Sequence, residues 1–478
     1  MTDARFTTDG GPTLLLTGEG PAPALVSLAG PRAHVRGTIT PAPAGWTAEL
    51  PLRASRWGGP ELPLPVGDYE LVIEGAAAEP AAVPLVQLGT LRAELDGATV
   101  RIGPPIDPAY DSGEGQDALE RRYATRPGGL ENAAFFESFY GRNASCNPLA
   151  IDRELARRAP RVTRYWSVVD LSVQVPEGAV AVVEGTPEWW RARGSSRLLV
   201  VNDWLRRRFA RRPGQIVLQT WHGTPLKRLA LHRPGFDPRR MAAVARESRR
   251  WNVLLAQNPY AARILGKAYA FLMRPVWVEG YPRNDVLTTG DGAAIRAALG
   301  IGPAERVLLY APTWRDDRQE MVDFVDPAAL AAEVDAVILV RGHSRTLQPG
   351  RDAAGPRVID VTGYPDTSQL LLAADGLITD YSSVMFDFSV TGKPMYFLVP
   401  DIEHYRGELR GFYFDLTAHA PGPVVRTQDE LVEALRTADP ADHAQKYALW
   451  REKFNARDDG HAAERVVARI LDQGYVTR

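Results

Sequence analysis

Two histidines in this sequence each follow an apolar run with the length and composition of a buried strand. His222 lies in QTWHGTPLKRLA (219–230), at the end of the run QIVLQT (215–220). A histidine at the carboxyl end of a parallel strand is well placed for catalysis, because an ordinary imidazole pKa of about 6.5 lets it take a proton from a hydroxyl at neutral pH. We therefore take His222 as a candidate general base. The alternative for this residue is capping or packing at the strand end.

The second histidine, His343, lies in VILVRGHSR (337–345) between Arg341 and Arg345. A histidine among arginines can neutralise a phosphate, and it is best used where a leaving group gains negative charge during phosphoryl transfer. The alternative is a solvated basic turn.

A third candidate is the polar turn in GLITDYSSVMFDFSVTGKP (376–394), where an apolar run is followed by Ser382 and Ser383 and then by a helical pattern. Hydroxyls and backbone N–H groups at a helix start are suited to binding a diphosphate. Asp387 lies one turn further on, within reach of a ribose or polyol hydroxyl. Ordinary N-capping explains the two serines equally well.

The runs that would position these residues form two series of buried strands alternating with helical segments. The pattern predicts two Rossmann-like domains in tandem, with a ligand cleft facing the carboxyl ends of the strands. The first series is YWSVVD (165–170), AVAVVEG (179–185), RLLVVND (197–203) and QIVLQT; the second is RVLLYAP (306–312), DAVILVRG (335–342), RVIDV (357–361), DGLITD (375–380) and PMYFLVP (394–400).

The first 115 residues differ from the rest, because they hold short apolar runs separated by Pro and Gly clusters. This spacing predicts a small all-β domain of sandwich or barrel type. The predicted organisation is a β-domain over 1–115, a linker over 116–130, a first Rossmann-like domain over 131–288, a second over 289–428, and C-terminal helices over 429–478 that pack back on the first.

Six motifs in register resemble the CDP-glycerol:poly(glycerophosphate) glycerophosphotransferase family of teichoic-acid and capsule polymerases. They are WHGTPLK (221–227), GYPRND (280–285), YAPTWRDD (310–317), RGHSR (341–345), TDYSSVMFD (379–387) and RGFYFDL (410–416). FESFYGRNASCNPLAI (136–151) is similar to the start of that family's catalytic region. The similarity covers roughly residues 131–437 and leaves the first 115 residues uncovered.

The resemblance implies a GT-B fold that binds a CDP-activated polyol mainly in the second domain and the acceptor mainly in the first. In the implied reaction, His222 deprotonates a hydroxyl of a polymer or lipid-linked acceptor, which attacks the β-phosphorus so that CMP leaves, with His343 stabilising the diphosphate. No cofactor or metal is implied; Asp316 and Asp317 fit an ion-pair turn better than a metal site. The implied donor-side residues are Thr379, Ser382, Ser383, Asp387, Arg341 and Arg410, and the acceptor-side residues are Trp221, Thr224 and Lys227.

Composition narrows the class of protein further. A net charge of −2 gives no general reason to expect a nucleic-acid partner. The single cysteine, Cys146, fits a reducing cytoplasm, and we see no signal peptide and no long apolar run.

Two stretches, WLRRRFARRP (204–213) and DPRRMAAVARESRRW (237–251), interleave arginines with large apolar residues. They fit either interfacial helices at the inner face of a membrane or arginine-rich solvated helices.

Two other functions stay open at this point. A glycosyltransferase with the same two-domain fold would release a nucleoside diphosphate instead of CMP, and a non-catalytic assembly protein would bind polymer without turnover. The sequence also leaves open the identity of the polyol, priming against polymerisation, the role of the β-domain and the oligomeric state.

Overall fold

The computed structural model describes residues 2–75, 80–125, 128–205, 209–313, 324–342, 357–409 and 411–478. It divides into two compact units. The first holds Met1–Glu131, Phe139–Ala144 and Arg164–Ser196, and the second holds Asn132–Ser138, Ser145–Thr163 and Arg197–Arg478.

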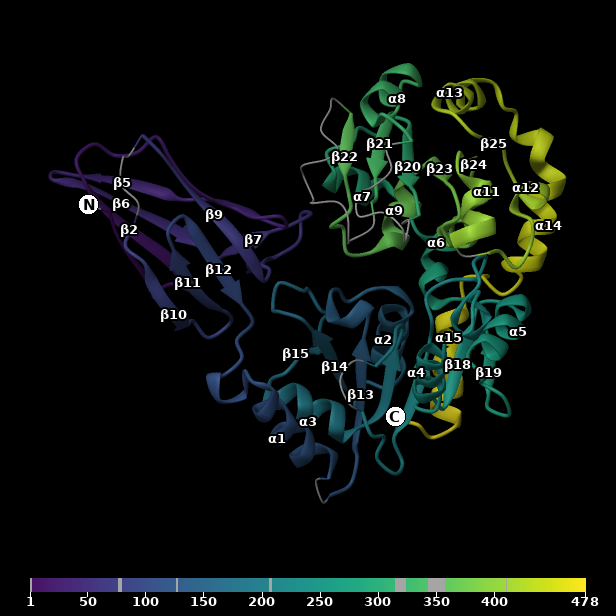
Figure 1. Ribbon diagram of the computed structural model, residues 1–478, viewed down its shortest axis with the longest axis horizontal. Helices are drawn as coiled ribbons and strands as arrows, with labels where there is room; N and C mark the ends of the chain where they lie inside the picture. Colours follow the sequence, from purple (N-terminus) through teal and green to yellow (C-terminus); the bar gives the residue numbers. More distant parts are fainter. Residues whose placement is uncertain are drawn as a thin grey trace. The chain divides into compact units, whose positions relative to one another are not determined.

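The first unit begins with an all-β domain of two antiparallel sheets and a hairpin (Figure 1). One sheet has the order β1 (Thr2–Thr7), β2 (Thr13–Glu19), β6 (Gly45–Pro51), β5 (Thr38–Ala42). The other has the order β10 (Val83–Gln87), β11 (Arg92–Asp96), β12 (Thr99–Gly103), β9 (Gly67–Glu74), β3 (Leu25–Ala29), β4 (His34–Arg36). The hairpin pairs β7 (Arg53–Ser55) with β8 (Glu61–Pro63).

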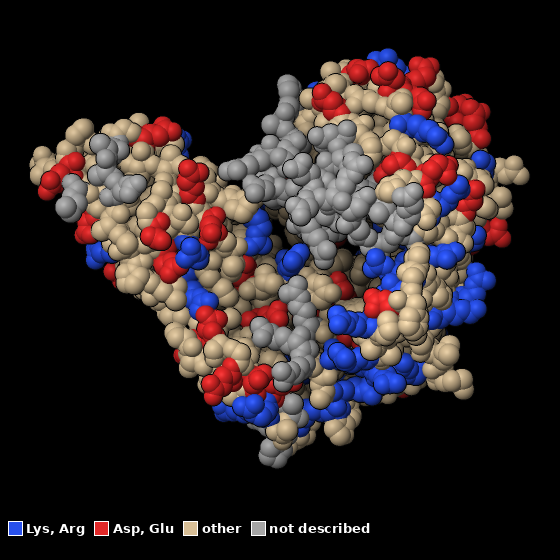
Figure 2. Space-filling view, in the orientation of Figure 1, with Lys and Arg blue, Asp and Glu red and all other residues tan. Residues whose placement is uncertain are grey.

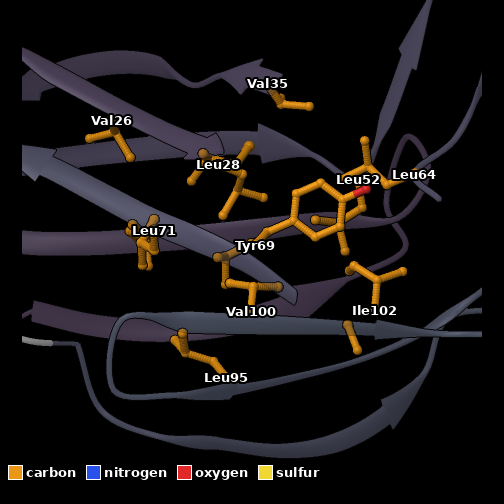
Figure 3. Packing of buried hydrophobic residues seen from close by; sticks show 14 of the residues in the cluster. Val26, Leu28, Val35, Leu52, Leu64, Tyr69, Leu71, Leu95, Val100 and Ile102 are labelled. Atoms are coloured by element: carbon orange, nitrogen blue, oxygen red, sulfur yellow. The ribbon is translucent and has the colours of Figure 1, made fainter. Parts of the chain in front are cut away.

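Alternate residues of these strands supply one hydrophobic core. In β12, Val100 and Ile102 are buried while Arg101 between them is exposed, as expected for a strand with one face covered. Figure 3 shows Tyr69 among the buried side chains of Leu28, Leu52 and Val100. The predicted N-terminal all-β fold is therefore confirmed.

A buried carboxylate fixes this β-domain to the loop that follows β14 (Thr163–Val168), which is part of the same unit. The Asp170 Oδ2 accepts a hydrogen bond from the Val66 N–H at 2.9 Å. Arg56 donates to the Ser172 carbonyl at 2.8 Å, and the Ser172 hydroxyl donates to Asp170 at 2.5 Å. Because Asp170 is almost fully buried, these bonds hold the β-domain firmly against the loop.

The rest of the first unit includes α1 (Gly113–Ala124), β15 (Val180–Val183), which pairs in parallel with β14, and α3 (Pro187–Ser195). The interval predicted as a linker, 116–130, contains most of α1. This helix starts where the Ser112 hydroxyl accepts a hydrogen bond from the Gly115 N–H at 3.0 Å, which is an ordinary N-cap.

In the second unit, one set of neighbouring strands forms what we call the first lobe. Their order is β13 (Glu131–Glu137), β16 (Ser196–Val201), β17 (Ile216–Gln219), β18 (Val253–Ala256), β19 (Val276–Val278), and β16 to β19 pair in parallel. Its helices include α2 (Cys146–Arg158), α4 (Pro238–Ser248) and α5 (Pro259–Ala268). β18 is buried along its whole length, as is usual for a parallel strand covered on both faces.

The second lobe is a parallel sheet with the order β22 (Val358–Asp360), β21 (Val337–Val340), β20 (Val307–Ala311), β23 (Gly376–Thr379), β24 (Met395–Leu398), β25 (Val424–Val425). Its helices include α8 (Pro327–Glu333), which packs on β21, and α13 (Gln428–Thr437), which packs on β24. Two parallel α/β sheets and an N-terminal all-β domain confirm the predicted fold class.

The C-terminal helices contact both lobes of the second unit. In α14 (Ala444–Phe454), the ring of Trp450 stacks on Phe386 of the second lobe at a centroid distance of 5.0 Å. α15 (Ala462–Asp472) packs on α2 of the first lobe with a fully buried face of Val466, Val467 and Ile470. α13 packs on the second lobe and α15 on the first, whereas α14 contacts both, because its Phe454 ring lies 5.3 Å from that of Tyr260 in α5.

Candidate active site

The turn after β17 carries His222 and has an unusual backbone. Trp221 has a φ of 54°, in the left-handed region that a bulky residue rarely adopts. Its ring is buried against Tyr269 at a centroid distance of 5.1 Å, and its N–H donates to the Gln219 side chain at 2.8 Å. These contacts offset the conformational energy that the left-handed backbone costs. Residues with such strained backbones are concentrated at functional sites.

His222 itself is oriented by two contacts. Its ring stacks on Trp221 with a centroid distance of 4.8 Å and an interplanar angle of 19°. Its Nδ1 lies 2.5 Å from the carbonyl oxygen of Asn202, the residue that follows β16. Because a carbonyl oxygen only accepts hydrogen bonds, Nδ1 must carry the hydrogen. The neutral imidazole then has its lone pair on Nε2, which makes Nε2 the nitrogen that can take up a proton.

Arg283 lies against the His222 turn from the loop after β19. Its Nη1 donates to the His222 carbonyl at 3.0 Å and also lies 3.0 Å from the Cys146 Sγ. Its Nε and Nη2 donate to the two oxygens of Asp387 at 3.3 and 2.7 Å. This bidentate ion pair has side-chain exposures of only 11% and 8%.

Asp387 belongs to α10 (Val384–Phe388) of the second lobe. Burial raises the pKa of its carboxyl, and the guanidinium of Arg283 acts against that rise. Both oxygens are bound by Arg283, so the carboxylate predicted to reach a ribose or polyol hydroxyl joins the two lobes of the second unit in the structure. Sequence reasoning gave Arg283 no role.

Ser382 and Ser383 lie directly before α10 and are half-buried. The Ser382 hydroxyl accepts from the Val384 N–H at 3.5 Å, a long bond, and Ser383 makes no side-chain cap bond to the helix. Ser383 instead faces the His222 turn, because a Cβ on Gly223 would lie 2.6 Å from its Oγ. The structure thus brings the predicted general base and the predicted donor-side serines together.

The three residues predicted on the acceptor side have different surroundings. Trp221 is buried beneath His222. The Thr224 hydroxyl is also buried and lies 2.6 Å from the Gln257 Oε1 and 3.1 Å from the Asn258 Nδ2. Lys227 is half-exposed, with its Nζ 5.9 Å from the centre of the Tyr405 ring. Of these three side chains, Lys227 is the most accessible.

The remaining predicted donor-side residues hold the second lobe together where they are described. The Thr379 hydroxyl donates to the Ala311 carbonyl at 2.8 Å. Arg341 donates to the carbonyls of Val361 and Tyr364, in the turn after β22, at 3.0 Å each, and burial lowers the pKa of its guanidinium to about 10. His343, Arg410, Asp316 and Asp317 lie outside the described residues.

Asn147 is a second residue that sequence reasoning missed. It is fully buried in the first turn of α2, and its Nδ2 donates to the carbonyls of Thr220 and Trp221 at 3.4 and 3.2 Å. Its Oδ1 accepts from the Arg283 N–H at 3.2 Å. Asn147 and Arg283 both lie in motifs singled out above, FESFYGRNASCNPLAI and GYPRND, which was the signal available.

A family model and individual relatives of known name agree on which proteins this chain resembles. The model of the family described as CDP-glycerol:poly(glycerophosphate) glycerophosphotransferase matches residues 122–472. A teichoic acid poly(glycerol phosphate) polymerase of Bacillus subtilis is 35% identical over 361 residues, covering 70% of this chain and 48% of that protein. A teichoic acid glycerol-phosphate transferase of Staphylococcus aureus is 33% identical over 379 residues, covering 71% of this chain and 93% of that protein.

The chain therefore spans about half the length of the first relative and nearly all of the second. Among solved structures, that of the wall teichoic acid polymerase TagF matches with a TM-score of 0.69 and 30% identity, over 75% of this chain and 94% of the other. The matched region contains every residue of the site described above.

Proposed function

Because the chain belongs to the CDP-glycerol:poly(glycerophosphate) glycerophosphotransferase family, we propose that it transfers glycerol phosphate from CDP-glycerol to a teichoic-acid-like or capsular polymer or its lipid-linked primer, releasing CMP. The observation that carries this proposal is the His222 turn. It presents a histidine with a fixed tautomer directly opposite the Ser383 side of the second lobe.

In the proposed reaction, the Nε2 of His222 takes the proton from an acceptor hydroxyl. The oxygen of that hydroxyl attacks the phosphorus that bears the glycerol, a new P–O bond forms, and the P–O bond to CMP breaks. Its electron pair leaves with CMP, so negative charge grows on the departing phosphate. His343 and Arg410 are the proposed groups that meet this charge. Ser382 and Ser383 are proposed to bind the donor diphosphate, with Lys227 on the acceptor side.

Glycerol is favoured over ribitol as the polyol by the pattern of relatives. The matches to glycerol-phosphate transferases and polymerases of B. subtilis and S. aureus reach 35% and 33% identity over about 70% of this chain. A teichoic acid ribitol-phosphate primase of Bacillus spizizenii is 30% identical over only 34% of this chain. CDP-glycerol is therefore the donor to test first.

The direct test is product analysis with purified protein. CDP-glycerol, CDP-ribitol and a UDP-sugar are each supplied with a glycerol-phosphate oligomer or a lipid-linked primer, and the released nucleotide is identified. The proposal predicts CMP from CDP-glycerol, dependent on the acceptor. Release of a nucleoside diphosphate from the UDP-sugar would assign a glycosyltransferase instead, and binding without turnover would assign an assembly protein.

We also propose that the first lobe attaches to the surface of the membrane on its cytoplasmic side, where a lipid-linked acceptor would lie. Among the described helices, none is long and apolar enough to cross a bilayer. Four large apolar side chains are nevertheless exposed around α4 and at the end of α5: Phe236 (84%), Met241 (44%), Leu272 (65%) and Met273 (102%).

Exposed basic side chains occur on the same two helices. Arg239, Arg246 and Arg249 are exposed on or beside α4, and Arg263 and Lys267 are exposed on α5. Figure 2 shows Lys and Arg gathered over the part of the second unit where Figure 1 draws α4. Helices that expose both apolar residues and cations suit an interface with anionic lipid headgroups.

A further inference from the structure

The carbonyl groups around His222 are held by side chains from two other parts of the fold. Asn147 donates to the carbonyls of Thr220 and Trp221, and Arg283 donates to that of His222. Three successive carbonyls are thus fixed, in a turn whose central residue has a left-handed backbone. A turn of this kind keeps its geometry only when its surroundings determine it.

The side chain of Arg283 also contacts the second lobe, which, among the described residues, that of Asn147 does not. Its Nε and Nη2 are bound by the carboxylate of Asp387, and its Nη1 is directed at the His222 carbonyl. Asp387 lies four residues after Ser383, on the short helix that follows the predicted donor-binding serines. One guanidinium therefore joins the proposed base to the proposed donor side.

We propose that Arg283 is a positioning residue for His222 and that Asp387 holds Arg283 in place. The inference rests on the function proposed above and assigns these two residues neither proton transfer nor contact with the donor. A fork of N–H groups already directed at a carboxylate, a thiol and a carbonyl is suited to fixing the geometry of its neighbours.

A role of this kind has a distinct kinetic consequence. If Arg283 fixes the direction of the His222 ring, its loss should lower the rate of the chemical step, because small errors in the placement of a catalytic group are costly. Donor affinity should change little, since the ion pair is not assigned to the donor. A fall in kcat at nearly constant KM for CDP-glycerol is therefore expected.

The first variant is Arg283→Lys, which keeps the positive charge and loses the fork. We expect kcat to fall on the order of 100-fold, with the KM for CDP-glycerol within about threefold of wild type. The second is Arg283→Ala, for which added methylguanidinium should restore part of the lost kcat. Rescue of kcat by a freely diffusing guanidinium without a change in melting temperature is a result that a purely structural role would not give.

Removing one charge from a buried pair can unfold a protein, so a third variant, Arg283→Gln combined with Asp387→Asn, replaces both charges with amides. It is expected to keep the wild-type melting temperature within a few degrees and still to have a reduced kcat, because the bond to the His222 carbonyl is lost. Arg469→Ala is the matched control, since Arg469 also pairs with a buried carboxylate, that of Glu279, at 2.7 Å. It should keep the wild-type kcat.

Failure of the positioning role and failure of the proposed function would give different results. Wild-type kcat in the double variant would overturn the positioning role, and so would a raised KM with unchanged kcat in Arg283→Lys, which would place Arg283 on the donor. A wild-type enzyme that releases no CMP would instead contradict the proposed function itself, before any variant is compared.

Discussion

Gly223, the residue after His222, faces Ser383 of the second lobe so closely that a methyl group on it would lie 2.6 Å from the Ser383 Oγ and 2.9 Å from its Cβ. Each of these distances is shorter than a normal van der Waals contact, so any side chain at this position would force Ser383 or the turn to shift. The backbone next to the proposed base therefore lies directly against the side chain of a proposed donor-binding serine.

This contact predicts a loss of activity from a single methyl group. Gly223→Ala should push Ser383 or the His222 turn aside, and we expect kcat/KM for CDP-glycerol to fall on the order of 10-fold to 100-fold. Ser383→Gly removes the atoms that the added methyl group would meet. Adding Gly223→Ala to Ser383→Gly should therefore lower kcat/KM less than Gly223→Ala lowers it in the wild type. Gly266→Ala, in α5, has nothing within 4 Å of the added methyl and serves as the control.

Asn147 should matter for both stability and turnover. Asn147→Ala removes bonds to the Thr220 and Trp221 carbonyls and leaves the buried Arg283 N–H without this acceptor. We expect a loss of about 1–3 kcal/mol in the free energy of unfolding, measured by urea denaturation, together with a lower kcat. Unchanged stability with wild-type kcat would show that the His222 turn does not depend on these bonds.

The carboxyl group of Asp458 should make the free energy of unfolding depend on pH. It is buried, accepts hydrogen bonds from the Tyr281 N–H at 2.9 Å and the Gln257 Nε2 at 2.7 Å, and burial raises its pKa from 3.8 to about 7. The folded state then holds a proton that the unfolded state has already lost, so stability falls as pH rises from about 4 to 7. A shift of this size corresponds to about 4 kcal/mol.

Thermal unfolding of the wild type and of Asp458→Asn between pH 4 and 8 measures this component. The variant cannot titrate at this position, so its melting temperature should fall less over the interval than that of the wild type, whatever its absolute stability. Parallel curves for the two proteins would show that Asp458 is ionised throughout this range in the folded state.

The exposed apolar residues of the first lobe make membrane attachment testable. Replacing Phe236, Leu272 and Met273 with serine should reduce co-sedimentation with vesicles containing anionic phospholipid, because about 25 cal/mol is lost for each Å² of apolar surface no longer buried. Leu449→Ser, at a residue of α14 that is 59% exposed, is the matched control. Equal binding by the triple variant and the wild type would contradict attachment through this surface.

Much of the fold could be predicted because local sequence determines it. The buried runs of the two lobes, such as VLLYA in β20, are apolar along their whole length and end in polar turns. His222 could be found for the same reason, since a strand followed by a polar turn is a local pattern. The helix α1 was missed because its first residues, GEGQ, look like a turn, although Ser112 is a normal cap.

The part of the site that could not be predicted depends on contacts between distant residues. Arg283 and Asp387 are 104 residues apart, and nothing in either motif says that the two side chains meet. Asp387 was therefore interpreted from its neighbours in sequence, Ser382 and Ser383, as a donor contact. The bonds from Asn147 to backbone carbonyls were missed for the same reason. Every residue has a backbone carbonyl, so the residue types do not show which carbonyls accept a side-chain hydrogen bond.

His222 is proposed to act as the general base of a CMP-releasing transfer. The measurement that tests it most directly is acceptor-dependent CMP release from CDP-glycerol by the wild type, His222→Gln and the exposed-histidine control His419→Gln. We predict release by the wild type and the control, and a kcat lower by roughly 100-fold to 10,000-fold in His222→Gln. Release at the wild-type rate by His222→Gln would contradict the account.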